Sequence, residues 1–80
     1  MTLSNAVKAR IKQLLTDKNL SVNRLATLSG IGESTIRNIL SSEGETPKTQ
    51  TLYYICRGFN ITLGDFFVCD LFSPENINDD

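Results

Sequence analysis

Apolar residues recur every three or four positions along most of this chain, which is the spacing of one buried face of an α-helix. The pattern predicts helices over residues 3–18, 22–29, 33–41 and 48–59, followed by a short helix that begins after Thr62. The apolar face of the first helix would hold Leu3, Val7, Ile11, Leu14 and Leu15, and that of the fourth Leu52, Ile55, Cys56 and Phe59. The chain is therefore expected to be all-α, as a compact bundle of five helices.

Residues 22–41 carry the most specific pattern. Two short helices are joined by Gly30-Ile31-Gly32, and the apolar positions Leu25, Ile31, Ile36 and Ile39 are spaced to meet in one core. Gly30 stands where the first of these helices ends, a position that favours the left-handed backbone conformation. Ser21 and Thr62 are suitable N-caps for the helices that follow them. This arrangement is typical of a helix-turn-helix, whose second helix commonly enters the major groove of DNA.

The length of 80 residues fits one small domain. We expect this domain to span residues 1–72, and residues 73–80 to form a polar, acidic tail that frays. No apolar run approaches the roughly 20 residues that cross a bilayer. The first residues also lack the features of a secretory signal. A cytoplasmic protein is the expectation.

The chain offers little to enzyme or metal chemistry. It contains no histidine and only two cysteines, Cys56 and Cys69, whose spacing fits neither a disulfide framework nor a zinc site. Both lie among apolar residues and are expected to pack as small hydrophobic side chains. We find no pair of carboxylates, phosphate-binding glycine loop or cluster of metal ligands. The sequence predicts no catalytic residue, metal, cofactor or small-molecule ligand.

The formal net charge of −1 argues against nucleic-acid binding until its distribution is considered. Residues 1–42 hold six cationic side chains and two carboxylates, a net charge of +4. Residues 43–80 hold two cationic side chains and seven carboxylates, a net charge of −5. The predicted helix-turn-helix lies in the basic half, which can face a polyanion while the acidic half points away.

Three segments together resemble the lambda-repressor/Cro family of DNA-binding domains, also called the xenobiotic-response-element family. IKQLLTDKNLS is similar to the first helix of that family, GIGESTIRNIL to its turn and recognition helix, and TPKTQTLYYICRGFNITLGDFF to its last two helices. The resemblance runs from about Val7 to Phe67. It implies a five-helix fold in which the second and third helices form the helix-turn-helix.

The same resemblance places contacts to base edges at Glu33, Ser34, Arg37 and Asn38. Arg37 can bind guanine O6 and N7 in a bidentate way or hold a phosphate, and Asn38 can pair with adenine. Glu33 has two possible roles. It could cap the helix, because a carboxylate is stabilised at a helix N-terminus, or it could accept a hydrogen bond from cytosine N4.

Phosphate contacts are expected around the same segment. The family often begins its second helix with a glutamine that donates to a phosphate, and here Val22 offers only its backbone N–H. The expected phosphate contacts are Val22, Asn23, Arg24, Thr35 and Ser41, with Thr46, Lys48, Lys12 and Lys18 as weaker candidates. Such contacts position a protein on DNA without reading its sequence.

Apolar residues are dense near the C-terminus, more than a chain of this size is expected to bury. We expect Leu63, Phe66, Phe67, Leu71 and Phe72 to form a homodimer contact. Such proteins bind two-fold symmetric sites whose halves lie about one helical turn, ~34 Å, apart.

These observations lead to a sequence-specific transcriptional regulator, expected to be a repressor, which binds double-stranded DNA through the helix Glu33–Ser41. The alternative is a protein-interaction module of the same fold, antitoxin-like or an anti-regulator, with weak or no DNA binding. The acidic net charge, Val22 and Glu33 favour this alternative.

Overall fold

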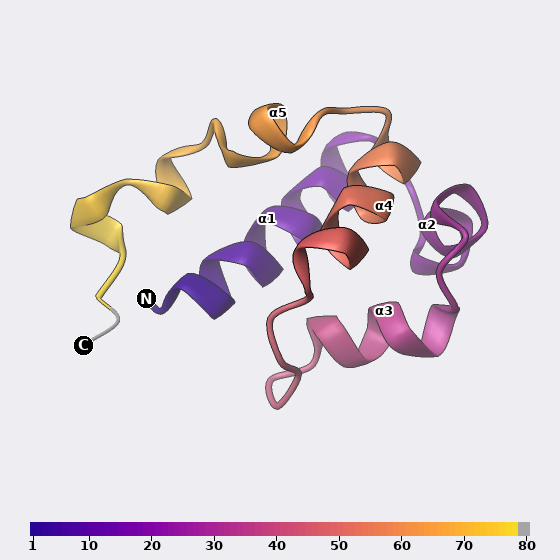
Figure 1. The fold of residues 1–80 in the computed structure, drawn as a ribbon, viewed down its shortest axis with the longest axis horizontal. Coiled ribbons are helices and arrows are strands. Elements are labelled where there is room, and N and C mark those ends of the chain that lie inside the picture. The colour runs from indigo at the N-terminus through magenta and orange to yellow at the C-terminus, as the bar shows by residue number, and fades with distance from the viewer. Residues whose placement is uncertain (79–80) are drawn as a thin grey trace.

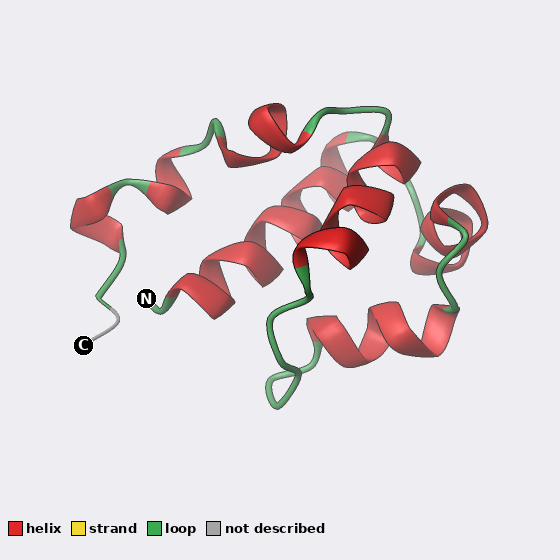
Figure 2. Cartoon of the chain, viewed as in Figure 1, coloured by secondary structure: helices red, strands yellow, loops and turns green. Residues whose placement is uncertain are grey.

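The computed structural model describes residues 1–78 and confirms the expected all-α fold (Figure 2). Its α-helices are α1 (Leu3–Asp17), α2 (Val22–Ser29), α3 (Glu33–Leu40), α4 (Thr49–Phe59) and α5 (Leu63–Phe67). Two short 3₁₀ helices follow, η1 (Asp70–Phe72) and η2 (Pro74–Asn76), and the described part of the chain contains no strand. None of its helices is long and apolar enough to cross a membrane.

The helices form a single cluster with dimensions of about 35 × 25 × 22 Å. In Figure 1, α3 runs along the lower edge, α2 stands beside it, and the segment after α5 follows the upper edge back toward the N-terminus. Helix α2 packs on both α4 and α3, α3 also contacts α1, and η1 lies against α1. The helix-turn-helix is therefore braced by α1 and α4 rather than standing alone.

The N-caps predicted from sequence are confirmed. The Ser21 hydroxyl accepts from the backbone N–H of Arg24 at 3.0 Å and so caps α2. Thr62 caps α5 in a capping box, because the Thr62 hydroxyl accepts from the Asp65 N–H at 3.0 Å and the Asp65 carboxylate accepts from the Thr62 N–H at 3.2 Å. These local bonds fix where each helix begins.

Left-handed residues end three of the helices. Gly30 has a φ of 73° after α2, as the sequence predicts. Asn19, with a φ of 54° after α1, and Asn60, with a φ of 61° after α4, are also left-handed, which the sequence pattern did not predict. Asparagine tolerates this conformation better than other residues with a Cβ, which explains why no glycine is needed there.

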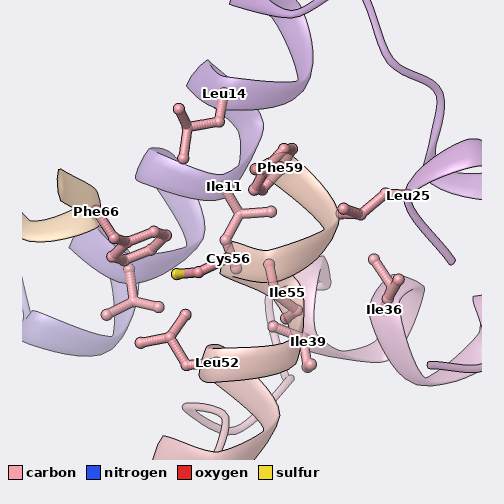
Figure 3. Packing of buried hydrophobic residues seen from close by; sticks show 11 residues of the cluster. Ile11, Leu14, Leu25, Ile36, Ile39, Leu52, Ile55, Cys56, Phe59 and Phe66 are labelled. Carbon is pink, nitrogen blue, oxygen red and sulfur yellow. The ribbon is translucent and has the colours of Figure 1, made fainter. Parts of the chain in front are cut away.

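The core is built from the apolar faces that the periodicity predicts (Figure 3). Its buried residues are Val7, Ile11, Leu14, Leu25, Ile36, Ile39, Leu52, Ile55, Cys56, Phe59 and Phe66. Ile31, Leu40 and Leu15 are half-buried and pack against this cluster. Leu3 was expected on the buried face but is exposed, because it occupies the first turn of α1, beyond the cluster.

Helices α2 and α4 meet at a glycine, Gly58, that the helical periodicity does not single out. Gly58 is buried inside α4, and a Cβ on it would lie 3.0 Å from the Cδ1 of Leu25 and 3.0 Å from the Cβ of Ser29. The small Ser29 side chain fits this close approach, and its hydroxyl donates to the carbonyl oxygen of Ala26 at 3.3 Å. A glycine inside a predicted helix is the sequence feature that could have indicated this close approach.

The acidic tail was expected to fray, but residues 73–78 are held by hydrogen bonds to the start of the chain. The N-terminal ammonium of Met1 donates to the carbonyl oxygen of Asn76 at 2.9 Å, and the Asn78 N–H donates to the carbonyl oxygen of Met1 at 3.0 Å. These bonds and η2 hold the tail beside the start of α1. Asp79 and Asp80 lie outside the described residues.

One face of α4 carries two aromatic side chains. Tyr53 is exposed and Tyr54 is half-buried, with ring centroids 5.8 Å apart. The Arg57 guanidinium lies 6.0 Å from the Tyr53 ring and 5.9 Å from the Tyr54 ring, within the range of a cation–π interaction.

Candidate nucleic-acid interface

The outer face of α3 is the polar stripe that the sequence predicts. Ile36 and Ile39 anchor the inner face in the core, and Ser34, Arg37 and Asn38 are exposed on the other side. The C-terminal aromatic residues do not cover Arg37, whose side chain is 62% exposed. Three of the four expected base-contact residues are therefore open to solvent on one helix.

Glu33, the fourth of these residues, is hydrogen-bonded within the chain and makes no cap hydrogen bond. Gly32 is the N-cap of α3, and no side chain makes a cap hydrogen bond there. The Glu33 carboxylate instead accepts from the Asn23 amide on α2 at 2.8 Å and from the Arg37 Nε at 2.9 Å. It still lies in the first turn, where the helix dipole favours its charge. It therefore joins two helices and the Arg37 side chain.

These bonds favour the charged form of Glu33. The hydrogen bond from the Asn23 amide, then that from Arg37, and the positive charge of Arg37 lower the pKa of the Glu33 carboxyl. The carboxylate is consequently ionised at neutral pH, and it neutralises part of the Arg37 charge on the surface expected to meet DNA.

The expected phosphate contacts lie on both sides of α3. At the start of α2, Asn23 and Arg24 are exposed, whereas Val22 is half-buried against the core and presents little side chain. Thr46 and Lys48 are exposed in the loop before α4, and Thr35 is exposed on α3. This spread would allow a duplex lying along α3 to be held from both ends.

Ser41, the C-cap of α3, is already engaged within the chain. Its hydroxyl donates to the carbonyl oxygen of Asn38 at 2.8 Å, and its own carbonyl oxygen accepts from Lys8 Nζ at 3.0 Å. A phosphate would have to compete for the Ser41 hydroxyl proton. Ser41 therefore serves the end of the helix in the free chain.

Two of the cations counted in the basic half hold the fold together. Lys8 is only 7% exposed and reaches the end of α3. The Arg10 guanidinium donates to the carbonyl oxygens of Phe66 at 2.8 Å and of Asp65 at 3.0 Å, which satisfies the end of α5. Lys12, Lys18 and Arg24 remain exposed, so the basic surface is smaller than the sequence count suggests.

The residues expected at a homodimer contact fall into three groups. Phe66 is fully buried in the chain's own core and leaves no side-chain surface for a second chain. Leu63, Leu71 and Phe72 are half-buried, and the centroid of the Phe72 ring lies 4.9 Å from that of the Phe67 ring. Phe67 is 43% exposed, and its neighbour Val68 in the same segment is 79% exposed.

Residues 1–78 contain no group of three or more histidine, cysteine or acidic side chains placed to hold a metal ion. Cys56 is buried, and burial raises the pKa of its thiol to about 11, which leaves it unreactive at neutral pH.

Comparison with known proteins gives two matches. The sequence model of the Cro/C1-type helix-turn-helix DNA-binding domain family matches residues 10–71. The crystal structure of the prophage Lp1 protein 11 superposes with a TM-score of 0.77 at 30% sequence identity, over 98% of this chain and 100% of that one. No curated protein sequence matches the chain. The two matches span the helix-turn-helix and both flanking helical segments.

Proposed function

The chain belongs to the Cro/C1-type helix-turn-helix DNA-binding family, and we propose that it is a sequence-specific transcriptional repressor in the cytoplasm. One observation supports this most directly: Ser34, Arg37 and Asn38 are exposed along α3, whose opposite face is fixed in the core by Ile36 and Ile39. A rigid helix with an exposed polar stripe can enter the major groove and present these side chains to base edges.

In this proposal the side chains of α3 read the bases. Arg37 binds a guanine through O6 and N7, Asn38 pairs with an adenine, and Ser34 donates to a base edge or a phosphate. Asn23, Arg24 and the Val22 N–H at the start of α2 hold one stretch of backbone, as do Thr46 and Lys48 beyond the end of α3. The function needs no cofactor, metal or catalytic residue.

The proposed repressor acts as a homodimer. The exposed Phe67 and Val68, with the half-buried Leu63, Leu71 and Phe72 beside them, supply the apolar surface for that contact. Two chains related by a two-fold axis would place their α3 helices in successive major grooves, with half-sites about 34 Å apart. The dimer bound to DNA would exclude polymerase from the promoter.

Selection of bound duplexes from a random library tests this proposal. We expect a two-fold symmetric site whose binding, followed by fluorescence anisotropy, weakens steeply with added salt because counterions are released. Arg37→Ala should cost about 1–3 kcal/mol on the selected site and flatten the sequence preference. Arg57→Ala is the matched control, because it removes the same charge from the surface of α4.

The alternative, an interaction module that has lost DNA binding, is favoured by one observation: Glu33 pairs with Arg37 and reduces the positive charge of α3. This alternative predicts no measurable binding to the selected or random duplex at low salt. Equal losses on specific and random DNA in Arg37→Ala would instead make Arg37 a phosphate contact.

A further inference from the structure

The Glu33 carboxylate links the Asn23 side chain of α2 to the Arg37 side chain of α3. Its Oε1 accepts from Asn23 Nδ2 on α2 at 2.8 Å, and its Oε2 accepts from Arg37 Nε, one turn further along α3, at 2.9 Å. Both oxygens therefore have a donor, one from each helix. Any donor on a DNA base would have to share or displace one of these bonds.

The bond from Arg37 Nε to Glu33 leaves the two terminal nitrogens of the Arg37 guanidinium available. A guanidinium carries five N–H groups, and Glu33 uses the one at Nε. Within residues 1–78 the two terminal nitrogens, Nη1 and Nη2, make no hydrogen bond, and the side chain is 62% exposed. These terminal nitrogens present four N–H groups, enough to grip O6 and N7 of one guanine.

We propose that Glu33 is a positioning residue for DNA recognition: anchored by Asn23, it orients the Arg37 guanidinium for bidentate binding of one guanine. This inference rests on the proposed function, because it assigns Glu33 a task only if Arg37 meets a base. It replaces the expected base contact of Glu33 with a role through Arg37.

Two physical arguments support this role. A long arginine side chain loses rotamer freedom on binding, and a partner that already restricts it lowers that cost. A carboxylate near DNA is also repelled by phosphates, and this repulsion is reduced where the negative charge is matched by Arg37. The hydrogen bonds from Asn23 and Arg37 keep Glu33 ionised, so the arrangement persists at neutral pH.

The pair contributes little to folding, so its variants are expected to fold. It is exposed and spaced i,i+4, a class of ion pair with small effects on stability. Asn23→Ala and Glu33→Gln therefore test recognition without destroying the domain. Circular dichroism and thermal unfolding verify that each variant remains helical.

The test measures affinity for the selected duplex, for a set in which each base pair is changed in turn, and for a random duplex. Wild type, Asn23→Ala, Glu33→Gln, Arg37→Ala and the double variant Glu33→Gln with Arg37→Ala are compared. We expect Asn23→Ala and Glu33→Gln to lower the preference of selected over random duplex by about 5- to 10-fold, part of the ~10- to 100-fold loss for Arg37→Ala.

Position and coupling identify the mechanism. Asn23→Ala and Glu33→Gln should lose sequence preference at the same base pair that Arg37→Ala affects. The double variant should lose no more preference than Arg37→Ala alone, because both changes remove the same interaction. Asn38→Ala is the matched control and should change the preference at a different base pair.

Three results would overturn the inference alone. A loss at a separate base pair that adds to that of Arg37→Ala would make Glu33 a direct base contact. If Glu33→Gln binds selected and random duplex more tightly by the same factor, Glu33 acts only as a repulsive charge. If Glu33→Gln leaves both affinities unchanged, Glu33 has no role in DNA recognition. If the wild-type chain binds no duplex, the proposed function itself is wrong and this inference falls with it.

Discussion

Lys8 Nζ and the Gly44 N–H converge on one acceptor, the carbonyl oxygen of Ser41, at 3.0 Å and 3.1 Å. Ser41 is the C-cap of α3, so α1 and the loop after α3 both hold the end of the helix proposed to read DNA. A positive charge at a helix C-terminus also interacts favourably with the helix dipole. The end of α3 is therefore fixed from two directions.

Replacing Lys8 should destabilise the domain. Lys8→Met keeps most of the buried stem but loses the charge and the hydrogen bond to Ser41, and we expect it to cost about 1–2 kcal/mol of unfolding free energy. Lys12→Met, one turn along α1 at an exposed position, is the control and should change stability by less than about 0.5 kcal/mol. Urea denaturation measures both. Equal stabilities of the two variants would show that the Lys8–Ser41 bond contributes nothing.

Gly44 should not tolerate a side chain. It is buried, and a Cβ there would overlap the carbonyl oxygen of Asn38 and lie 2.9 Å from that of Ile39. We expect Gly44→Ala to cost about 2–4 kcal/mol, because the loop or the end of α3 must shift. Gly64→Ala in α5 is the control: its Cβ would lie 3.6 Å from the Thr62 hydroxyl, an ordinary contact. Thermal unfolding should show a lower midpoint for Gly44→Ala alone.

The two cysteines should react at very different rates in the folded chain. Burial raises the pKa of the Cys56 thiol to about 11, so at pH 8 only about one molecule in a thousand carries the reactive thiolate. Cys69 is half-buried near the surface. We expect a thiol reagent to modify Cys69 quickly and Cys56 only when the core opens. In Cys69→Ser the fast phase should vanish; if two fast phases appear in the wild type, Cys56 is not protected by the core.

The contribution of Glu33 to stability should depend on pH in one direction. Its pKa in the folded chain is lowered below the ordinary value of 4.5, chiefly by the Asn23 amide and then by Arg37. Its stabilising effect is therefore fully present above about pH 4.5 and is lost as the pH falls through the lowered pKa. The difference in melting temperature between wild type and Glu33→Gln should be larger near pH 6 than in strong acid. A difference that grows on acidification would contradict this assignment.

Local sequence patterns were sufficient to predict the five α-helices and most of the core. Ile36 and Ile39 face inward because their spacing requires it, and Ser21 and Thr62 begin helices through bonds to residues three positions away. Arg37 and Asn38 are exposed for the same reason. These features depend on neighbours along the chain.

Several features that sequence reasoning missed depend on distant partners. Lys8 meets Ser41 across 33 positions and Arg10 meets Phe66 across 56, so periodicity marks both cations only as polar residues on a helix. The Asn23–Glu33 bond spans 10 positions across the turn, and it follows from how closely α2 and α3 approach. Charge counting therefore overestimated the basic surface, since it could not show which cations were engaged.

The aromatic pair on α4 has a practical consequence for spectroscopy. The chain has no tryptophan, and Tyr53 and Tyr54 are its only tyrosines, so intrinsic ultraviolet fluorescence arises almost entirely from one helix. Helix α3 contains no aromatic residue. A change in tyrosine emission during a titration would place the event near α4 and Arg57, and an event confined to α3 would require an attached dye to be seen.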